Sequence, residues 1–231
     1  MSTLLRVPEP EVMDTAVDAE DYDAMDHSQI NDRFARDLLS ATASRGSMLD
    51  VGTGTGLIPF ALLAADPAIE QIVGADLSEE MLKLARRTAA ARGYQRASFD
   101  RVDGKALPYG TETFDVVFSN SLVHHVLDPR AMFSEKWRVL KRGGTLFVRD
   151  LFRPENEDLI QRELALSFPE PAPADPNLSA RWERQRSLLE ASFYASYTLG
   201  EVAAFLREAG VPQGSLLVTS PRHWTLHIKK D

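Results

Sequence analysis

Short apolar segments alternate, through the middle of the chain, with segments whose apolar residues recur every three or four positions. The first pattern predicts buried strands, and the second predicts helices that bury one face. Their alternation is typical of a parallel sheet whose strands are joined by helices. The predicted strands are 47–52, 71–76, 97–102, 114–119 and 145–150, and the predicted helices are 57–65, 79–92 and 130–140.

The remaining parts of the chain predict further helices and a hairpin. Residues 27–43 place apolar side chains four positions apart, as in an amphipathic helix. Residues 155–195 predict two helical stretches broken by a proline-rich segment. Segments 215–220 and 223–230 predict a terminal β-hairpin. Gly143-Gly144 is expected to end the last of the central helices.

Composition and charge exclude several classes of protein. The 231 residues are 44% apolar and 26% charged, which is ordinary for a globular chain with a full core. The formal charge is −8, with both signs mixed along the chain, so DNA and long RNA are poor candidate partners. No cysteine occurs, which excludes disulfides, thiolate metal sites and cysteine nucleophiles. No apolar run approaches the ~20 residues of a membrane span, and the expected location is the cytoplasm.

A glycine-punctuated turn follows the first predicted strand and opens a helix. Gly52, Gly54 and Gly56 allow the backbone to bend tightly and to approach a ligand without a Cβ in the way. The third glycine comes one position too early for the G-x-G-x-x-G pattern of NAD or FAD binding. Asp50, just before the turn, suits a ligand with a positive end better than a pyrophosphate. A sulfonium-containing amino acid fits that description.

The segment Asp50-Val-Gly-Thr-Gly-Thr-Gly56 resembles the first signature of the class I S-adenosylmethionine (SAM) dependent methyltransferases. Three more segments, 71–87, 101–109 and 114–129, are similar to that family in the same order. The resemblance covers roughly residues 45–150. It implies an α/β fold, a three-layer sandwich with a seven-stranded, mostly parallel Rossmann-like sheet and helical cap elements. It also implies SAM as cofactor and S-adenosylhomocysteine as product.

The resemblance assigns roles to residues at the ends of the predicted strands. Asp76 is expected to hold both ribose hydroxyls, and Asp103 to meet the adenine amino group. Asn120 is expected to support the methionine portion, and Asp50 the amino group, directly or through water. The full set expected to bind the cofactor is Asp50, Gly52, Thr53, Gly54, Gly56, Asp76, Leu77, Asp103, Gly104 and Asn120.

Candidates for catalysis and substrate binding lie farther from the glycine turn. His124 and His125 follow the predicted strand 114–119, where an acceptor would meet the methyl group, and a histidine there can remove the acceptor's proton. A purely structural role for both remains the alternative. Two further pairs of residues are candidates. The first pair belongs to the N-terminal segment and is a candidate for the lid; the second pair consists of arginines that could bind a charged substrate. Surface ion pairs explain the arginines equally well. These residues are Tyr22, His27, Arg149 and Arg153.

The sequence therefore predicts one domain and one reaction class. Within residues 1–231 we expect an N-terminal cap and leading helix (1–45), a SAM-binding core (46–150), a helical insertion over the active-site mouth (151–195), and a last helix with the terminal hairpin (196–231). The expected function is metal-independent methyl transfer to a small molecule by in-line displacement, at an O, N, C or S atom. The small-molecule substrate is the expected partner, without nucleic acid or membrane. The protein is expected to be a monomer or a homodimer. Alternatives are a catalytically silent SAM-binding sensor or partner protein, and a transferase that uses a modified SAM.

Overall fold

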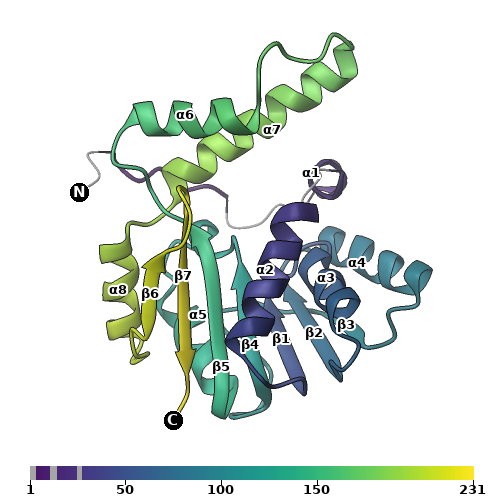
Figure 1. Cartoon of the computed structure of the whole chain (residues 1–231), viewed down its shortest axis with the longest axis vertical. Coiled ribbons are helices and arrows are strands. Elements are labelled where there is room, and N and C mark those ends of the chain that lie inside the picture. Colours follow the sequence, from purple (N-terminus) through teal and green to yellow (C-terminus); the bar gives the residue numbers. More distant parts are fainter. Residues whose placement is uncertain (1–3, 11–14, 25–27) are drawn as a thin grey trace.

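The computed structural model describes residues 4–10, 15–24 and 28–231 (Figure 1). Its described part forms one seven-stranded sheet with the order β3-β2-β1-β4-β5-β7-β6. Strands β1 to β5 run parallel, whereas β7 is antiparallel to β5 and β6 is antiparallel to β7. The strands are β1 Ser47–Val51, β2 Gln71–Asp76, β3 Ala97–Arg101, β4 Phe114–Asn120, β5 Leu140–Leu151, β6 Ser215–Val218 and β7 His223–Lys229.

Helices cover both faces of this sheet and one of its ends (Figure 1). Helices α2, α3 and α4 lie on one face, and α5 and α8 lie on the other. Helices α6 and α7 project beyond the end of the sheet. The helices are α1 Ala16–Asp23, α2 Ser28–Ala41, α3 Leu57–Ala65, α4 Glu79–Arg92, α5 Arg130–Val139, α6 Glu157–Ser167, α7 Pro176–Ala195 and α8 Leu199–Glu208, with a short 3₁₀ turn η1 at Val123–His125.

Alternating side chains along β1 show why the sheet is buried on both sides. Met48 packs in the apolar cluster that includes Phe34 of α2 and Leu62 of α3. Leu49, the next residue, packs in the cluster that includes Phe133 of α5 and Val202 of α8. Successive strand residues point to opposite faces, so an almost continuous apolar strand is stable only between two helical layers. The expected three-layer α/β fold with a mostly parallel sheet is confirmed.

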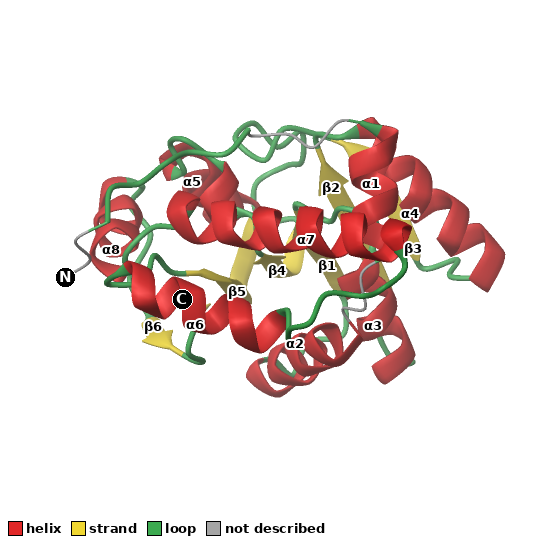
Figure 2. Cartoon of the chain, turned by 90° about the horizontal axis from the view of Figure 1, so that it is seen from above, coloured by secondary structure: helices red, strands yellow, loops and turns green. Residues whose placement is uncertain are grey.

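The cap lies over the carboxyl ends of the parallel strands. Figure 2 shows α7 crossing above the ends of β4 and β1, with α6 beside it. The N-terminal residues 4–10 run along the end of α7. The N–H of Val7 donates to the carbonyl of Tyr194 (3.0 Å), and Nε of Arg6 donates to the carbonyl of Ala195 (2.7 Å). Two segments distant in sequence therefore close the same end of the sheet.

Two details differ from the sequence-based expectations. Gly143-Gly144 does not end helix α5, which ends at Val139 and passes directly into β5. The two glycines lie instead where the β4–β5 register shifts, because Phe114 pairs with Leu140 but Val116 pairs with Thr145. A Cβ on Gly144 would lie 2.8 Å from the carbonyl oxygen of Asp115, so this close approach requires glycine. Helix α1 was not predicted, because its short polar segment carries little apolar periodicity.

The paired strands β6 and β7 confirm the predicted hairpin, and the two helices α6 and α7 confirm the predicted helical stretches within residues 155–195. Among the described residues, no helix combines the length and the apolar character needed to cross a membrane.

Candidate active site

A cavity opens at the carboxyl ends of β1, β2 and β4, where the predicted cofactor residues converge. Its wall contains these predicted residues: Tyr22, Gly52, Gly54, Asp76, Leu77, Asp103, Gly104, Asn120 and His125. Sequence reasoning did not assign the other lining residues, which are Val51, Ala75, Ser78, Met81, Val102, Lys105, Ser121, Leu122, Val126 and Met132. Most of these are apolar and project from strand ends and helix starts. Such side chains give the cavity an apolar wall with a few polar groups, as in small-molecule sites generally.

The turn after β1 adopts the conformation that its glycines allow. Gly52, Gly54 and Gly56 have φ angles of 81°, 54° and 82°, in the left-handed region that side chains disfavour. The N–H of Gly52 donates to the carbonyl of Ala75 (2.7 Å), which joins the turn to the end of β2. A Cβ on Gly52 would lie 2.7 Å from a methyl group of Leu122. The turn is therefore a cradle that only a bare backbone can form.

Asp76, at the end of β2, has a fixed carboxylate in the cavity wall. Its Oδ2 accepts from the N–H of Gly54 (2.8 Å), and its Oδ1 accepts from the N–H of Ser78 (2.9 Å). Burial raises the pKa of Asp76 above its ordinary value, although the hydrogen bonds from Ser78 and Gly54 oppose this. Each carboxylate oxygen retains a lone pair for a further donor. Two vicinal ribose hydroxyls are donors that fit this arrangement.

Asp103 and Gly104 form the loop after β3. Oδ1 of Asp103 accepts from the N–H of Lys105 (2.9 Å), so the carboxylate stabilises its own turn. A Cβ on Gly104 would lie 2.9 Å from a methyl group of Val51, so this position needs glycine for the loop to approach β1. Gly104 thereby lets the loop after β3 approach the end of β1.

Asp50 lies beneath the turn rather than in the cavity wall. It is 2% exposed, and burial raises its pKa to about 7. Thr53 and Gly56, also predicted to bind cofactor, lie in the turn but outside the cavity lining. Their contribution is to the shape of the turn. Asp50 likewise does not line the cavity itself.

A lysine that sequence reasoning missed lies near Asp50. Lys136 of α5 is completely buried, and its Nζ donates to Oγ of Ser119 in β4 (2.7 Å). Burial lowers the pKa of Lys136 to about 7, while the charges of Asp150 and Asp50 oppose that shift. A signal was present in the sequence, because Lys136 shares helical spacing with the buried Met132 and Val139. A lysine on the apolar face of a helix requires a polar partner in the core.

His124 is buried and bound to Asp150. Its Nδ1 lies 2.5 Å from Oδ1 of Asp150, while Oδ2 of Asp150 accepts from the N–H of Val123 (2.5 Å). Burial alone would lower the pKa of His124, but the charge and hydrogen bond of Asp150 raise it above its ordinary value. Asp150, near the end of β5, lies in the interior at 1% exposure. His124 does not line the cavity.

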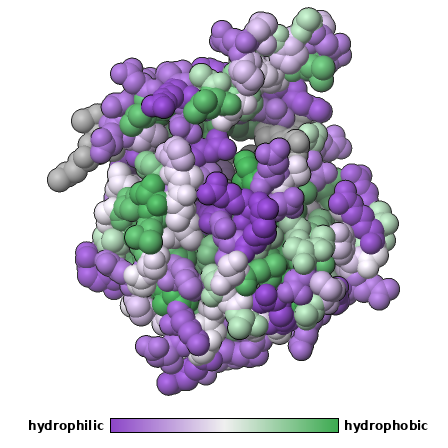
Figure 3. Space-filling view, in the orientation of Figure 1, coloured by the Kyte–Doolittle hydropathy of each residue, from purple (hydrophilic) through white to green (hydrophobic). Residues whose placement is uncertain are grey.

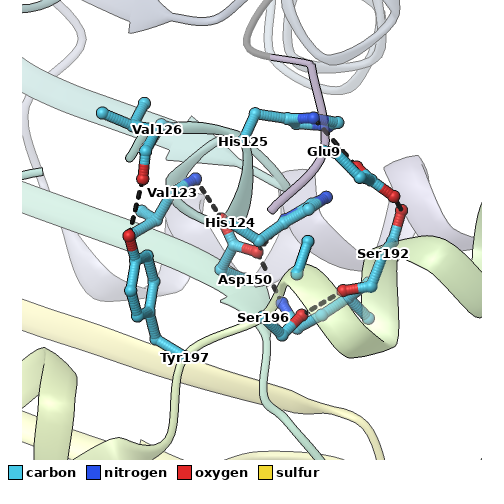
Figure 4. Close-up of polar contacts among 12 residues, drawn as sticks. Glu9, Val123, His124, His125, Val126, Asp150, Ser192, Ser196 and Tyr197 are labelled. Carbon is cyan, nitrogen blue, oxygen red and sulfur yellow. Dashed lines mark hydrogen bonds and ion pairs between the residues drawn. The ribbon is translucent and has the colours of Figure 1, made fainter. Parts of the chain in front are cut away.

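His125 does line the cavity and forms an ion pair with Glu9 (Figure 4). Nδ1 of His125 lies 3.1 Å from Oε2 of Glu9, and Oε1 of Glu9 accepts from Oγ of Ser192 in α7 (3.0 Å). Burial would raise the pKa of Glu9, but the hydrogen bond and charge of His125 hold it below the ordinary value. Sequence reasoning missed Glu9, whose segment shows only prolines on either side and no periodicity.

The other candidates for the substrate site and the lid do not all lie in the cavity wall. Tyr22 of α1 lines the cavity, and burial raises its pKa to about 12, so it carries a hydroxyl proton. His27 lies outside the described residues. Arg153 donates to both carboxylate oxygens of Glu201 (3.1 and 3.0 Å) and does not line the cavity. Its place is in the packing of α8 against the end of β5.

Arg149 lies in a second cavity, outside the wall described above. Its guanidinium donates to Asp37 of α2 (2.7 Å) and to Thr225 of β7 (3.0 Å). Arg33 and Arg222 line the same second cavity. Figure 3 shows hydrophilic residues gathered on this face, below the overhang of α6 and α7. Arg149 thus joins α2 to β7, and the structure does not bring it together with the predicted cofactor residues.

The family model described as a methyltransferase domain matches residues 49–148. The chain is 36% identical over 124 residues to the demethylmenaquinone methyltransferase of Roseiflexus castenholzii, covering 53% of this chain and 50% of that protein. It is 34% identical over 128 residues to the ubiquinone biosynthesis O-methyltransferase of Sinorhizobium medicae, covering 54% and 49%. A SAM-dependent methyltransferase from Aquifex aeolicus has a similar solved structure, with TM-score 0.67, 18% identity and coverage of 92% and 97%.

The sheet order, the glycine turn and the position of Asp76 at the end of β2 define a Rossmann-like architecture. Residues 49–148 match the methyltransferase domain that the family model describes, and the chain has the fold of a solved SAM-dependent methyltransferase. The chain spans about half the length of the curated relatives it matches.

Proposed function

We propose that this protein transfers a methyl group from SAM to a small organic molecule. One observation carries the proposal: the glycine turn, Asp76, Asp103 and Asn120 meet in one cavity, and His125 lies in the same wall. The first four positions suit the methyl donor, and the fifth lies toward the cap where an acceptor would enter. The proposed binding sites of the methyl donor and of the acceptor are therefore adjacent.

The residues of the cavity fit SAM on structural grounds. Cβ atoms at Gly52 and Gly104 would meet Leu122 and Val51 below 3.0 Å, so both glycines are required by the shape of the cavity. Asp76 presents fixed acceptor oxygens for ribose hydroxyls. Asp50 places a carboxyl group beneath the turn; a cationic ligand would favour its ionised form, whereas a pyrophosphate would oppose it. We propose the same residues for cofactor binding as the sequence predicts, with Thr53 and Gly56 acting through the turn.

The chemistry requires little from the protein beyond alignment. SAM, when bound, supplies a methyl carbon on a sulfonium, so displacement by an aligned nucleophile needs chiefly proximity and exclusion of water. Tyr22 lines the cavity and α7 crosses above the strand ends, an arrangement that would help to exclude water. We propose that His125 faces the acceptor, because it lines the cavity. His124 is a positioning residue, since its Nδ1 is bound to the buried Asp150.

Several features support a small acceptor rather than a nucleic acid. The chain has a formal charge of −8, and phosphate backbones require basic surfaces. Helices α6 and α7 overhang the strand ends, which favours a molecule that fits beneath them. One relative is named as a demethylmenaquinone methyltransferase, and another as a ubiquinone biosynthesis O-methyltransferase. An aromatic quinone precursor is therefore a suitable first acceptor to assay.

Incorporation of a radiolabelled methyl group tests this proposal. The protein would be incubated with labelled SAM and cell extract, and the products separated into small-molecule and macromolecular fractions. We expect label in the small-molecule fraction with the wild-type protein and none with Asp76→Ala. Label in no fraction, with SAM binding intact by calorimetry, would favour the sensor alternative. If the protein bound a modified SAM but not SAM itself, the result would favour the alternative of a transferase that uses a modified SAM.

A further inference from the structure

Three potential metal ligands converge beside the cavity, from two distant parts of the chain. Glu9 comes from the N-terminal segment, and His124 and His125 come from the turn after β4. One ligand atom from each lies within 4.8 Å of the other two. The two imidazole rings are 4.1 Å apart between centroids and tilted by 37°. Figure 4 shows both rings directed toward Glu9. We propose that these three residues bind a divalent transition-metal ion.

The hydrogen bonds around the cluster orient its atoms for this role. Asp150 occupies Nδ1 of His124, so Nε2 is the nitrogen of His124 left for the cluster. A metal-binding histidine usually donates its other ring N–H to a carboxylate or carbonyl, which fixes the ring and raises its basicity. Ser192 plays the corresponding part for Glu9, because its hydroxyl holds one carboxylate oxygen at 3.0 Å. The ring of His124 and the carboxylate of Glu9 therefore each have a hydrogen-bond partner outside the cluster.

Burial and charge also suit a cation. His124 is 3% exposed, and the side chains of His125 and Glu9 are 20% and 12% exposed. The carboxylates of Glu9 and Asp150 offset the two charges of a divalent ion. Arg6 is the nearest described cation to His124, but its guanidinium is engaged by the carbonyls of Ala195 and His124 and lies 4.0 Å from the centroid of the Tyr197 ring.

The ligand set restricts the metal. Two imidazole nitrogens and one carboxylate oxygen suit Zn²⁺, Fe²⁺, Co²⁺ or Ni²⁺, and disfavour Ca²⁺ and Mg²⁺, which prefer all-oxygen sites. Bonds to zinc are about 2.0–2.2 Å long, so the three atoms would close toward the ion from their present separation. Glu9, on a segment without regular secondary structure, can make this adjustment. Three protein ligands leave coordination positions open.

An open position would face the acceptor, because His125 lines the cavity. This role rests on the proposed function, whereas metal binding itself does not. An acceptor hydroxyl or thiol bound there would lose its proton to solvent, and its heteroatom would attack the methyl carbon as the carbon–sulfur bond breaks. His125 would then be a ligand and not a base. The proposal departs from the metal-independent transfer expected from the sequence.

Metal titration of the untagged full chain tests the proposal, since a histidine tag would bind metal itself. After dialysis against EDTA, Zn²⁺ is titrated by calorimetry and Co²⁺ by its visible absorption. We expect one ion per chain and a Co²⁺ spectrum of nitrogen and oxygen ligation. Glu9→Gln and His125→Ala should each weaken binding at least tenfold, and Asp150→Asn by about 10–100-fold through His124. His223→Ala, a histidine of β7 outside the cluster, is the matched control.

Absence of saturable one-to-one binding would overturn the proposal. So would binding that survives in both Glu9→Gln and His125→Ala, because the ion would then lie elsewhere. Circular dichroism of each variant, together with calorimetry of SAM on the same samples, separates loss of metal from loss of fold. SAM binding without metal binding would contradict the metal site alone and leave the proposed methyl transfer intact.

Discussion

Oδ2 of Asp76 accepts a hydrogen bond from the N–H of Gly54 at 2.8 Å, and this bond joins the end of β2 to the turn after β1. The two parts of the predicted cofactor site therefore hold each other in place before any ligand binds. A site assembled in this way loses little entropy when the ligand arrives.

Asp76→Ala should abolish most of the affinity for SAM. The variant loses two acceptors for ribose hydroxyls, and hydrogen bonds to a charged group contribute about 1.5–3 kcal/mol each. We expect the dissociation constants of SAM and S-adenosylhomocysteine to rise by about 100-fold or more, as measured by calorimetry. Asp100→Ala on β3, which removes the partner of the Tyr109 hydroxyl, is the control and should leave affinity unchanged. Equal affinity in wild type and Asp76→Ala would exclude the assigned ribose role.

Gly52→Ala should impair SAM binding more than Gly93→Ala does. Both glycines have positive φ, 81° and 70°, so alanine at either costs about 1–2 kcal/mol of backbone strain. At Gly52 the new methyl would also displace Leu122 of the cavity wall, whereas at Gly93 nothing lies within 4 Å. Thermal melts should show the greater destabilisation for Gly52→Ala, and calorimetry should show a loss of SAM affinity only for Gly52→Ala. Equal SAM affinity in the two variants would contradict the cradle.

His125 and His124 should respond differently to alanine. His125→Ala is expected to leave the melting temperature nearly unchanged and to lower turnover by about 10²-fold or more, because His125 helps the acceptor to lose its proton, either as a base or as a metal ligand. His124→Ala leaves the buried Asp150 without its partner, and breaking a buried pair costs about 3–5 kcal/mol. Differential scanning calorimetry and steady-state methyl transfer measure the two effects. Intact turnover in both variants would remove the histidines from the mechanism.

Lys136 should make the protein more stable as the pH rises above neutrality. Its pKa falls from 10.5 to about 7 on folding because it is buried, so between these values the unfolded chain binds the additional proton. The free energy of unfolding therefore increases with pH over this window. Urea unfolding at pH 7, 8 and 9 should show this rise in wild type and in Lys141→Met, whose lysine is partly exposed. Lys136→Met should lack it, and an identical rise there would disprove the assignment.

Arg153→Ala should affect stability and not SAM affinity. The guanidinium donates to Glu201 and to the carbonyl of Ser196 (3.2 Å), outside the cavity wall. Loss of these bonds is expected to cost about 1–3 kcal/mol. Chemical unfolding and calorimetry with SAM measure the two quantities. A large fall in SAM affinity with unchanged stability would instead restore Arg153 to the ligand site.

The convergence of most of the predicted cofactor residues on one cavity could be predicted because the sequence signals are local. Gly52, Gly54 and Asp76 lie at strand ends that periodicity places at one edge of a parallel sheet. Glu9 and His125 meet only through the folded cap, and no pattern around residue 9 indicates that contact. Arg149 was predicted to follow the fifth strand and bind a charged substrate. A position on a strand does not show which of the two cavities a side chain lines.

The contact between Glu9 and Ser192 joins residues 183 positions apart, whereas Gly54 of the glycine turn and Asp76 lie 22 positions apart. One wall of the cavity is thus encoded in a compact block of sequence, and the contacts of the cap join remote segments. The remote segments can therefore diverge while the block that carries the proposed cofactor residues stays unchanged. Exchanging residues 4–10 and 155–195 between relatives is therefore the most direct route to a changed acceptor preference.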